Sequence, residues 1–574
     1  LSGTPTSIAT QTFTVTATDT LGCTGALSYT MTPNPNTDWG DFSGFGTASN
    51  TLNSNLRLGA LVDVEGVAPT DANATGDDLS GSDDEDGITF PSMTAGQPVT
   101  VPVTITNNIG TVAYLNVWMD FNDNGVLTDA GEQIANNVSI PNGSTNLVQN
   151  VSFTLPASTV TTSTIGVRAR LTFAATPGST GSGSAGEVED YAVTVLNPTT
   201  DFGDWSGAAD AVNTANSNLR MGALVDAEYT ATKNAAATGD DTTGNDDEDG
   251  VTIPALTAGG PATIGVTVTN STGANAYLNA WIDFNNNGSF ADAGEQVFAN
   301  ITITTGAANS LQNLGITVPP AAVTGTALGA RFRLTSATSP GPTGIGGVGE
   351  VEDYVVTIAQ PTTDFGDYAS FASASSTRNA NLRLGATIDT EYAATTNAAA
   401  TGDDTTGTDD EDGVTLPTMT AGAPATIPVV VTNNTGAAAY LNAWIDYNGN
   451  NSIADAGEQI ATNVSVATAT TNGTLNLNVT VPATALTGVS LGVRVRLTST
   501  LSPGVSGASG NGEVEDYKII IAAPTTDFGD FSGFADASQG VNTSLRMGAL
   551  IDAEFVATKN ATSTGDDTTG TDDE

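Results

Sequence analysis

The chain has 574 residues, with 62 acidic and 14 basic side chains and no histidine, so its formal net charge is −48 at pH 7. This composition excludes nucleic acid as a partner, because contacts with phosphates need many Lys and Arg side chains. Such a charge also pushes a compact chain apart, and we therefore expect divalent cations to offset it.

Residues 1–36 are expected to be the end of a separate β domain followed by a linker. Polar and apolar residues alternate along 12–18, as in a strand, and 28–31 is expected to pair with this segment as a hairpin. The lone cysteine, Cys23, excludes a disulfide framework. We interpret it as a small buried or unpaired thiol, or as one that pairs with a cysteine upstream of this sequence. Because the chain starts without Met and stops inside an acidic run, we expect it to be a section of a longer polypeptide.

From residue 37 the sequence repeats every 163 residues. The sequence Gly-Glu-Val-Glu-Asp-Tyr at 186–191 returns unchanged at 349–354 and 512–517. A repeat this long is typical of a string of folded domains, since solenoid units have about 20 to 50 residues. We expect acidic segments to alternate with β-sandwiches, at 37–87 and 88–199, 200–250 and 251–362, 363–413 and 414–525, and 526–574 for the start of a fourth unit.

The first part of each unit is acidic and loop-rich, and in unit 1 only 56–63 has the pattern of a strand. By composition such a segment is close to disordered. We expect it to pack on the sandwich before it, or on a neighbouring molecule, and to bind cations, because adjacent carboxylates repel by about 1 kcal/mol per pair at ~4 Å in water. A solvated acidic loop is the alternative. The candidate ligands are Asp77, Asp78, Asp83, Asp84, Glu85 and Asp86 in unit 1, Asp240, Asp241, Asp246, Asp247 and Asp249 in unit 2, and Asp403, Asp404, Asp409, Asp410 and Asp412 in unit 3, with Asp38, Asp41, Asp63 and Glu65 as possible further members in unit 1.

The second part of each unit is a series of alternating strands separated by Asn, Gly, Pro and Ser. This pattern predicts an all-β fold of tandem antiparallel β-sandwiches with Ig-like, Greek-key links. Alternate residues such as Val101 and Val103 share one strand face and are expected in the core. In unit 1 the strands are expected at 99–106, 113–121, 133–140, 147–155, 165–173 and 187–196, with a weaker one at Ile88.

The loop at 120–132 has the pattern of a calcium site. Asp, Asn and Asn at loop positions 1, 3 and 5, followed by a turn-forming Gly, supply the hard oxygens that calcium prefers. The start matches an EF-hand loop, but the last acidic residue comes one place late and no helices flank it. A polar turn with a solvated carboxylate is the alternative. The candidate calcium ligands are Asp120, Asn122, Asn124, Thr128, Asp129 and Glu132 in unit 1, Asp283, Asn285, Asn287, Asp292 and Glu295 in unit 2, and Asp446, Asn448, Asn450, Asp455 and Glu458 in unit 3.

Arginines recur two residues apart on the strand before the repeated hexapeptide. In an extended strand the two glutamates of the hexapeptide share one face, while its valine and aspartate share the other. Bidentate Arg–carboxylate pairs are strong, so we expect structural ion pairs, calcium ligation by at least one of these acids, or both. The residues concerned are Arg168, Arg170, Glu187, Glu189 and Asp190, then Arg331, Arg333, Glu350, Glu352 and Asp353, then Arg494, Arg496, Glu513, Glu515 and Asp516.

Catalysis is not expected, because the chain has no histidine and no nucleophile or phosphate-loop motif in a suitable context. Paired carboxylates could serve a glycosidase, but the same site in every unit is typical of spacers and binding arrays. The tryptophans Trp118, Trp281 and Trp444 precede the predicted calcium loops. We expect them in the core, with a sugar-binding platform as the alternative.

The ordered motifs of each unit resemble the GEVED-type domain of bacterial secreted and surface proteins. In unit 2 they are 201–204, 219–222 with 226–228, 238–241, 246–251, 283–285 and 349–354, and the resemblance covers 37–574. The sequence departs from that family after the first motif, where Trp205 and Ser206 stand in place of Ala-Pro, and at 216–218. Residues 1–36 resemble the last hairpin of a bacterial Ig- or cadherin-like repeat. The resemblance implies a β-rich, multi-copy extracellular module without known catalytic residues.

Together these features predict a structural repeat region of a giant extracellular or cell-surface bacterial protein. It would form a calcium-stiffened stalk, adhesin extender or filament. Self-association, or a cell-surface or glycan target bound by other parts of the parent protein, is expected, without membrane insertion of this section. The alternative is an array of β-sandwiches that bind carbohydrate or another surface.

Overall fold

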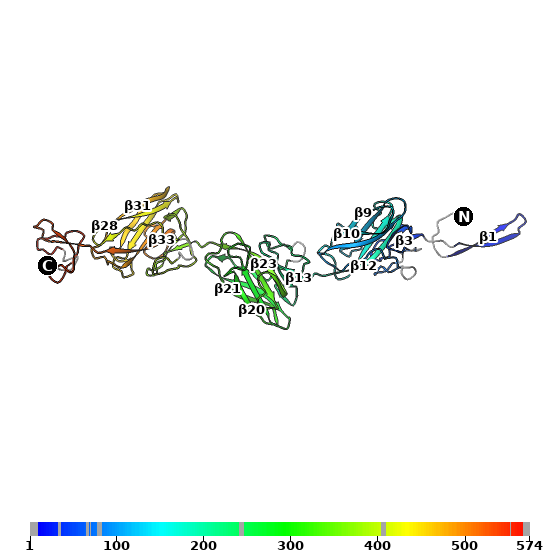
Figure 1. Ribbon diagram of the computed structural model, residues 1–574, viewed down its shortest axis with the longest axis horizontal. Helices are drawn as coiled ribbons and strands as arrows, with labels where there is room; N and C mark the ends of the chain where they lie inside the picture. The colour runs from blue at the N-terminus through cyan, green and yellow to red at the C-terminus, as the bar shows by residue number, and fades with distance from the viewer. Residues whose placement is uncertain are drawn as a thin grey trace.

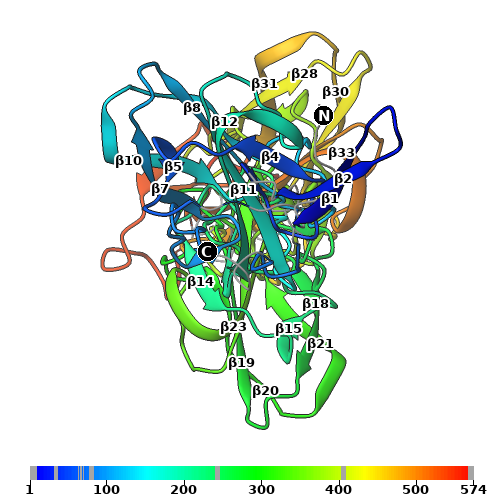
Figure 2. The same cartoon turned by 90° about the vertical axis from the view of Figure 1, so that its right-hand side faces the viewer.

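The computed structural model describes residues 10–31, 36–62, 64, 68, 70–76, 83–239, 246–402, 409–551 and 553–565. The chain forms an extended row, with an N-terminal hairpin at one end, three β units in the middle and the partial fourth unit at the other end (Figure 1). Viewed along the row, the three units point in three different directions around the long axis (Figure 2). The described residues include no helix that is both long and apolar enough to cross a membrane.

Each complete unit is a sandwich of two sheets, as unit 2 illustrates. The larger sheet runs β13 (Thr200–Phe202), β14 (Ala211–Thr214), β23 (Gly344–Ala359), β22 (Ala327–Thr335), β19 (Ala276–Ile282) and β20 (Gln296–Ile303), with β17 (Leu256–Thr257) also beside β23. In the smaller sheet, β15 (Leu219–Met221), β16 (Val251–Thr252) and β21 (Ala307–Thr317) all pair with β18 (Pro261–Asn270). Only β14 and β17 run parallel to their partner. The chain therefore crosses between sheets after β14, β16, β17, β18, β20 and β21, and the expected all-β, antiparallel sandwich is confirmed.

Units 1 and 3 have equivalents of all these strands except β16, in whose place Ile88 and Val414 each form a single bridge. Unit 1 contains β3 (Thr37–Trp39), β4 (Ala48–Thr51), β5 (Leu56–Leu58), β6 (Met93–Thr94), β7 (Pro98–Asn107), β8 (Ala113–Met119), β9 (Gln133–Ile140), β10 (Ser144–Thr154), β11 (Thr164–Thr172) and β12 (Gly181–Leu196). Unit 3 contains β24 (Thr363–Phe365), β25 (Ala374–Thr377), β26 (Leu382–Leu384), β27 (Met419–Thr420), β28 (Pro424–Asn433), β29 (Ala439–Ile445), β30 (Gln459–Val466), β31 (Thr470–Thr480), β32 (Ser490–Thr498) and β33 (Gly507–Ala522). The partial fourth unit has β34 (Thr526–Phe528) and β35 (Ser538–Gly540).

The core of each unit lies between the two sheets. Alternate residues of β18 and β22 are fully buried there, because period-2 alternation places one set of side chains inward. In unit 2 these include Ile264 and Val268 on β18 and Phe332 and Leu334 on β22. The predicted strands match the observed ones closely, and the prediction at 133–140 coincides with β9.

The acidic segment belongs to the sandwich that follows it, which corrects the expectation that it packs on the sandwich before it. Its strands β13 and β14 extend the larger sheet, and β15 joins the smaller one. Leu219 and Met221 of β15 are fully buried in the core. The equivalent Leu545 and Met547 of the partial unit, which has no such sandwich in this sequence, are 80% and 92% exposed. The boundaries predicted between acidic segments and sandwiches thus fall inside single folded units.

The N-terminal hairpin lies apart from the units, at the blue end of Figure 1. Its strands β1 (Gln11–Thr18) and β2 (Thr24–Met31) pair antiparallel, as predicted, and their residues are almost all exposed. Cys23 lies in its turn and is an exposed free thiol.

Candidate functional site

The strand that carries the repeated hexapeptide, β23 in unit 2, presents charged residues on both faces of the larger sheet. Its register on β22 places Asp353 opposite Arg331, and Glu350 and Glu352 opposite Leu334 and Phe332. Since cross-strand partners share a face, Asp353 lies on the outer face with Arg331. The two glutamates lie on the inner face with the apolar core.

On the outer face, Arg331 and Asp353 form a fully buried ion pair. The guanidinium donates from Nε to Oδ1 and from Nη2 to Oδ2 of Asp353, both at 2.7 Å, and from Nη1 to the carbonyls of Ala209 and Pro342. The backbone N–H of Trp205 also donates to Asp353. The pair therefore fastens the loop after β13 to the sheet, and Arg168–Asp190 and Arg494–Asp516 repeat it.

The glycine of the Asp-Phe-Gly-Asp motif is explained by this ion pair. A Cβ on Gly203 would lie 2.7 Å from Asp353 Oδ2 and 2.9 Å from Arg331 Nη2. Only glycine allows the backbone to approach the pair so closely. The motif is thus a docking segment for the buried ion pair.

The second arginine of the strand, Arg333, does not pair with Glu350 or Glu352. The predicted ion pairing of this arginine with the glutamates is therefore wrong. Arg333 donates to Asn213 Oδ1 at 2.6 Å and to the carbonyls of Val212 and Gly341. Burial, and after it the charge of Arg331, lowers the pKa of Arg333 to about 10. The equivalent Arg170 and Arg496 also bind carbonyls of the neighbouring turn. These arginines close a turn, and Asn213 is a site residue that sequence reasoning missed.

On the inner face the glutamates hold the acidic segment. Glu350 accepts the N–H of Met221 on β15, and Glu352 accepts the N–H of Gly250 at 3.0 Å and the hydroxyl of Tyr354 at 2.9 Å. The same hydroxyl accepts the N–H of Val251. Because these contacts recur in units 1 and 3, the hexapeptide strand is the anchor of the acidic segment in every unit.

Further carboxylates surround these glutamates and form what we call the acid cluster. Asp201 of β13 accepts the N–H of Val351 at 2.6 Å, and Asp247 accepts the N–H of Asp226 at 3.0 Å. All members except the half-buried Asp226 and its equivalent Asp389 are buried. The cluster comprises Asp201, Asp226, Asp247, Glu350 and Glu352 in unit 2, Asp364, Asp389, Asp410, Glu513 and Glu515 in unit 3, and Asp38, Asp84, Glu187 and Glu189 in unit 1.

The members of the acid cluster disfavour one another's ionisation. Burial, followed by the charges of Glu352 and Asp201, raises the pKa of Glu350 well above its usual range. Burial raises the pKa of Glu189 to about 8, and burial together with the charge of Asp389 raises that of Asp410 to about 7. At neutral pH the cluster therefore has to retain protons or gain a cation.

In each unit at least one glutamate oxygen of the cluster has no hydrogen-bond partner. The Oε1 atoms of Glu187, Glu350 and Glu513 are buried and have no partner. Glu350 and Glu352 take part in none of the ion pairs formed within the described part of the chain. As the side chains stand, no three Asp, Glu or Cys residues among those described are arranged to hold a metal ion. A cation would therefore require carboxylates to rotate toward it.

The predicted calcium loop brings its candidate ligands together, but hydrogen bonds of its own close it. In unit 2, Asp283 accepts the N–H groups of Asn287 and Gly288, and the amides of Asn285 and Asn287 both donate to Asp292. The same pattern recurs in unit 1 and unit 3. Amide nitrogens, not oxygens, therefore face the aspartate.

Glu295 lies under this loop and is 2% exposed, and its Oε2 has no partner. Burial, with the charges of Asp283 and Asp292, raises its pKa. The two amides lower the pKa of Asp292. Thr128 of the unit 1 loop is exposed. The arrangement fits a self-contained polar turn at least as well as a calcium loop.

Apart from Asp41, which is buried and accepts the N–H of Gly76 at 2.7 Å, the remaining predicted acidic residues divide into three groups. Asp86 accepts the N–H of Ala60 at 2.8 Å, and Asp249 and Asp412 do the same for Ala223 and Ala386, so these acids hold a turn. Asp83, Asp246 and Asp409 are exposed, and Glu85 is half-buried. Asp63, Glu65, Asp77, Asp78, Asp240, Asp241, Asp403 and Asp404 lie outside the described residues.

Sequence reasoning named Asp38 and Asp63 as possible members in unit 1, and these are the equivalents of Asp201 and Asp226, but it missed Tyr354. The available signal for Tyr354 was its place at the end of the repeated hexapeptide. The three tryptophans are core residues, since Trp281 is 3% exposed and packs with Trp205 and Phe290 under the outer loop. Equivalent small cores contain Trp118 and Trp444.

Comparison with known proteins gives one family and several distant structures. The family model of the GEVED domain matches residues 114–194, 277–357 and 440–520. No curated protein sequence matches the chain.

Among solved structures, E. coli alpha-2-macroglobulin is 9% identical, with 90% of this chain and 29% of that chain covered and a TM-score of 0.21. Titin domains A168–A170 are 8% identical (76% and 97% covered, TM-score 0.16), and a 1.5-MDa bacterial ice-binding adhesin is 12% identical (75% and 91% covered, TM-score 0.16). The chain thus spans less than a third of the first of these proteins. TM-scores this low establish no common fold for the whole chain, so nothing about function follows from them.

The three family matches begin on β8, β19 and β29 and end within the last strand of each unit, so each contains the hexapeptide and both arginines. They have the same 163-residue spacing as the hexapeptide itself. The chain therefore carries three GEVED domains in tandem.

Proposed function

We propose that the chain is a structural spacer of an extracellular or cell-surface bacterial protein, and that each unit binds calcium at its acid cluster. The spacer would form part of a stalk, an adhesin extender or a filament. The observation that carries the proposal is the acid cluster itself, in which buried and half-buried carboxylates from four separate motifs meet at the same place in successive units.

Calcium suits the cluster for chemical reasons. It takes six to eight hard oxygen ligands in flexible geometry, and extracellular modules bind it with Kd values of about 10⁻⁴ to 10⁻³ M. The cluster offers carboxylate oxygens, and the unpartnered Oε1 of Glu350 is a ligand already free of other bonds. A divalent ion would also offset part of the net charge of −48. The Asp283 loop is the second candidate site.

The mechanical effect follows from where the cluster members lie. Asp201 is on β13, Asp226 and Asp247 lie near the two ends of the connection between β15 and β16, and Glu350 and Glu352 are on β23. An ion among them would join the acidic segment to the sandwich at one point. Each unit would then resist local opening under tension, which is the requirement for a spacer.

We further propose that the units act without catalysis. Partners would be other copies of the protein, or surface targets bound elsewhere in the parent protein. A carbohydrate-binding array has less support, because the tryptophans that might have served as sugar platforms are buried.

Thermal unfolding of the full chain, with millimolar calcium or with a chelator, tests the proposal. At tenfold excess of calcium over Kd, binding stabilises a unit by about 1.4 kcal/mol, so Tm should rise by a few degrees. The variant E187Q/E350Q/E513Q should lose this rise, while the loop variant D129N/D292N/D455N should keep it. Equal Tm values in calcium and chelator would refute the proposal. Loss of the rise only in the loop variant would move the site to the loop.

A further inference from the structure

The linkers between units are short and contain proline. Only three residues separate the last strand of one unit from the first strand of the next, and the middle one is Pro198, Pro361 or Pro524. Proline fixes its own φ and restricts the residue before it. The linkers therefore allow little independent motion, in contrast to flexible Gly/Ser linkers.

An aromatic residue of each following unit lies on a glycine of the preceding one. Gly96 has a φ of +82° in the turn after β6, and a Cβ on it would lie 3.1 Å from the Cβ of Tyr229. At the next two junctions the corresponding distances are 3.3 Å, from Gly259 to Tyr392 and from Gly422 to Phe555. The positive φ of the turn favours glycine, and the close contact leaves little room for a Cβ there.

The aromatic residue is fixed on its own unit. The N–H of Glu228 donates to Thr200 O at 2.7 Å, and its carboxylate accepts the N–H of Phe202 at 3.2 Å. Glu391 and Glu554 make the same two contacts in the following units. The side chain of Tyr229 is therefore presented by a paired backbone segment and not by a free loop.

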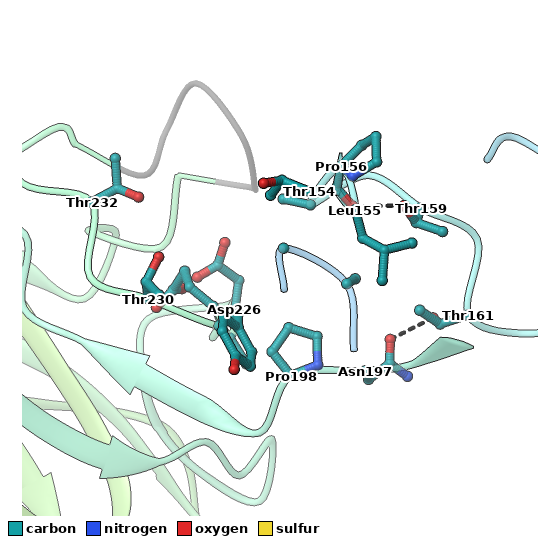
Figure 3. Close-up of a pocket in the computed structure, with 16 residues that line it drawn as sticks. Thr154, Leu155, Pro156, Thr159, Thr161, Asn197, Pro198, Asp226, Thr230 and Thr232 are labelled. Carbon is teal, nitrogen blue, oxygen red and sulfur yellow. Dashed lines mark hydrogen bonds between the residues drawn. The ribbon is translucent and has the colours of Figure 1, made fainter. Parts of the chain in front are cut away.

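Both units line the space around this contact. Figure 3 shows Asp226 and Thr230 of unit 2 on one side, Leu155 and Pro156 of unit 1 on the other, and Pro198 of the linker between them. The cavity measures about 470 Å³ at this junction, and about 240 and 280 Å³ at the next two. The same positions, including the Ala-Gly turn and the linker proline, line all three.

We propose that this contact is a joint that sets the orientation of each unit on the one before it. We call the aromatic residue, the turn glycine and the linker proline together the aromatic–glycine joint. Because each junction repeats it, successive units turn about the long axis in the fan that Figure 2 shows. The joint rests on the proposed role of the chain as a spacer. It needs no metal, so it can be tested separately from the calcium site.

Spin-label distance measurements on the full chain test the joint. With Cys23→Ser as background, Val148→Cys and Leu311→Cys place labels at equivalent positions of units 1 and 2 that are 57% and 58% exposed. The parent should give one narrow distance distribution, with or without a chelator. Tyr229→Ala should broaden it, because the ring that lines the cavity between the two units is then lost.

Tyr229→Phe is the matched control and should keep the narrow distribution, since the third junction carries Phe555 in place of tyrosine. Insertion of Gly-Ser after Asn197 leaves every side chain intact and should broaden the distribution as Tyr229→Ala does. Tm values equal to those of the parent would confirm that the units stay folded. A distribution that is equally narrow in Tyr229→Ala and in the insertion variant would overturn the joint, as would a parent distribution that is broad from the start.

Discussion

At the scale of single residues, the buried Arg331–Asp353 pair explains most of the repeated charge pattern. Breaking a buried pair leaves an uncompensated charge, which costs about 3 to 5 kcal/mol. Arg331→Ala should therefore lower the unfolding free energy of unit 2 by that amount, as measured by denaturant unfolding. Arg331→Lys should recover little, because lysine cannot donate bidentately from a planar group.

The exposed pair Lys233–Asp210 is the natural control, since its side chains are 23% and 53% exposed. Exposed pairs contribute roughly 0 to 1 kcal/mol, so Lys233→Ala should change stability little. Similar losses for Arg331→Ala and Lys233→Ala would mean that the buried pair is not a main stabilising contact.

The acid cluster predicts an unusual pH dependence. Glu189 has its pKa raised from 4.5 to about 8 when folded. The folded chain then holds a proton that the unfolded chain has lost, so stability is full below about pH 4.5 and falls as the pH rises toward 8. In a chelator, Tm should decline over this range. The variant E189Q/E352Q/E515Q should decline less.

Calcium should make Tm depend less on pH, because the bound ion balances the negative charge of the ionised carboxylates at high pH. Its effect on Tm should be largest near pH 8 and should vanish near pH 4.5, where protons compete for the ligands. A Tm that rises from pH 5 to pH 8 in chelator would contradict the assignment of these carboxylates as buried and uncompensated.

The pairing of an arginine with the aspartate of the hexapeptide could be predicted from the sequence, because period-2 alternation places them on one face. The role of Glu350 and Glu352 could not. They lie on the apolar face, and their partners are N–H groups of residues about 100 or more positions away in sequence. Every residue except proline has a backbone N–H, so the sequence does not reveal which of these groups will bind a glutamate. A glutamate that binds backbone N–H groups therefore cannot be distinguished, from sequence, from one that pairs with an arginine.

At the scale of elements, the acidic segment is part of the sandwich core. Leu219 is fully buried, and truncating such a side chain costs about 2 to 5 kcal/mol. Leu219→Ala should therefore destabilise unit 2 by that amount in denaturant unfolding. Leu545→Ala changes the equivalent residue of the partial unit, which is 80% exposed, and should have little effect. Comparable effects of the two substitutions would contradict this packing.

The long strands could be predicted to within a few residues, since each has apolar residues at every second position. Strands β13 and β14 could not, because they are three and four residues long and rich in Thr, Asn and Asp. β14 pairs with β23, more than a hundred residues further on, and β13 pairs in turn with β14. The acidic segment looks like a near-disordered region for the same reason, since its apolar partners all come later in the chain.

At the scale of the whole molecule, the 163-residue repeat predicted the number of units correctly, and the row in Figure 1 follows from it. The orientation of the units could not be predicted, because it depends on the contact of Tyr229 with a glycine 133 residues earlier. The same segment also carries Asp226 of the acid cluster. Asp226 of the acid cluster and Tyr229 of the aromatic–glycine joint therefore lie close together in the sequence.

The most direct test of the central claim is a crystal structure of the chain grown in millimolar calcium, with anomalous scattering data. We predict an ion among Asp201, Asp226, Asp247, Glu350 and Glu352, with oxygen ligands at about 2.3 to 2.6 Å, and an equivalent ion in unit 3. Clusters without anomalous density, with their carboxylates hydrogen-bonded to backbone and water at saturating calcium, would contradict the claim.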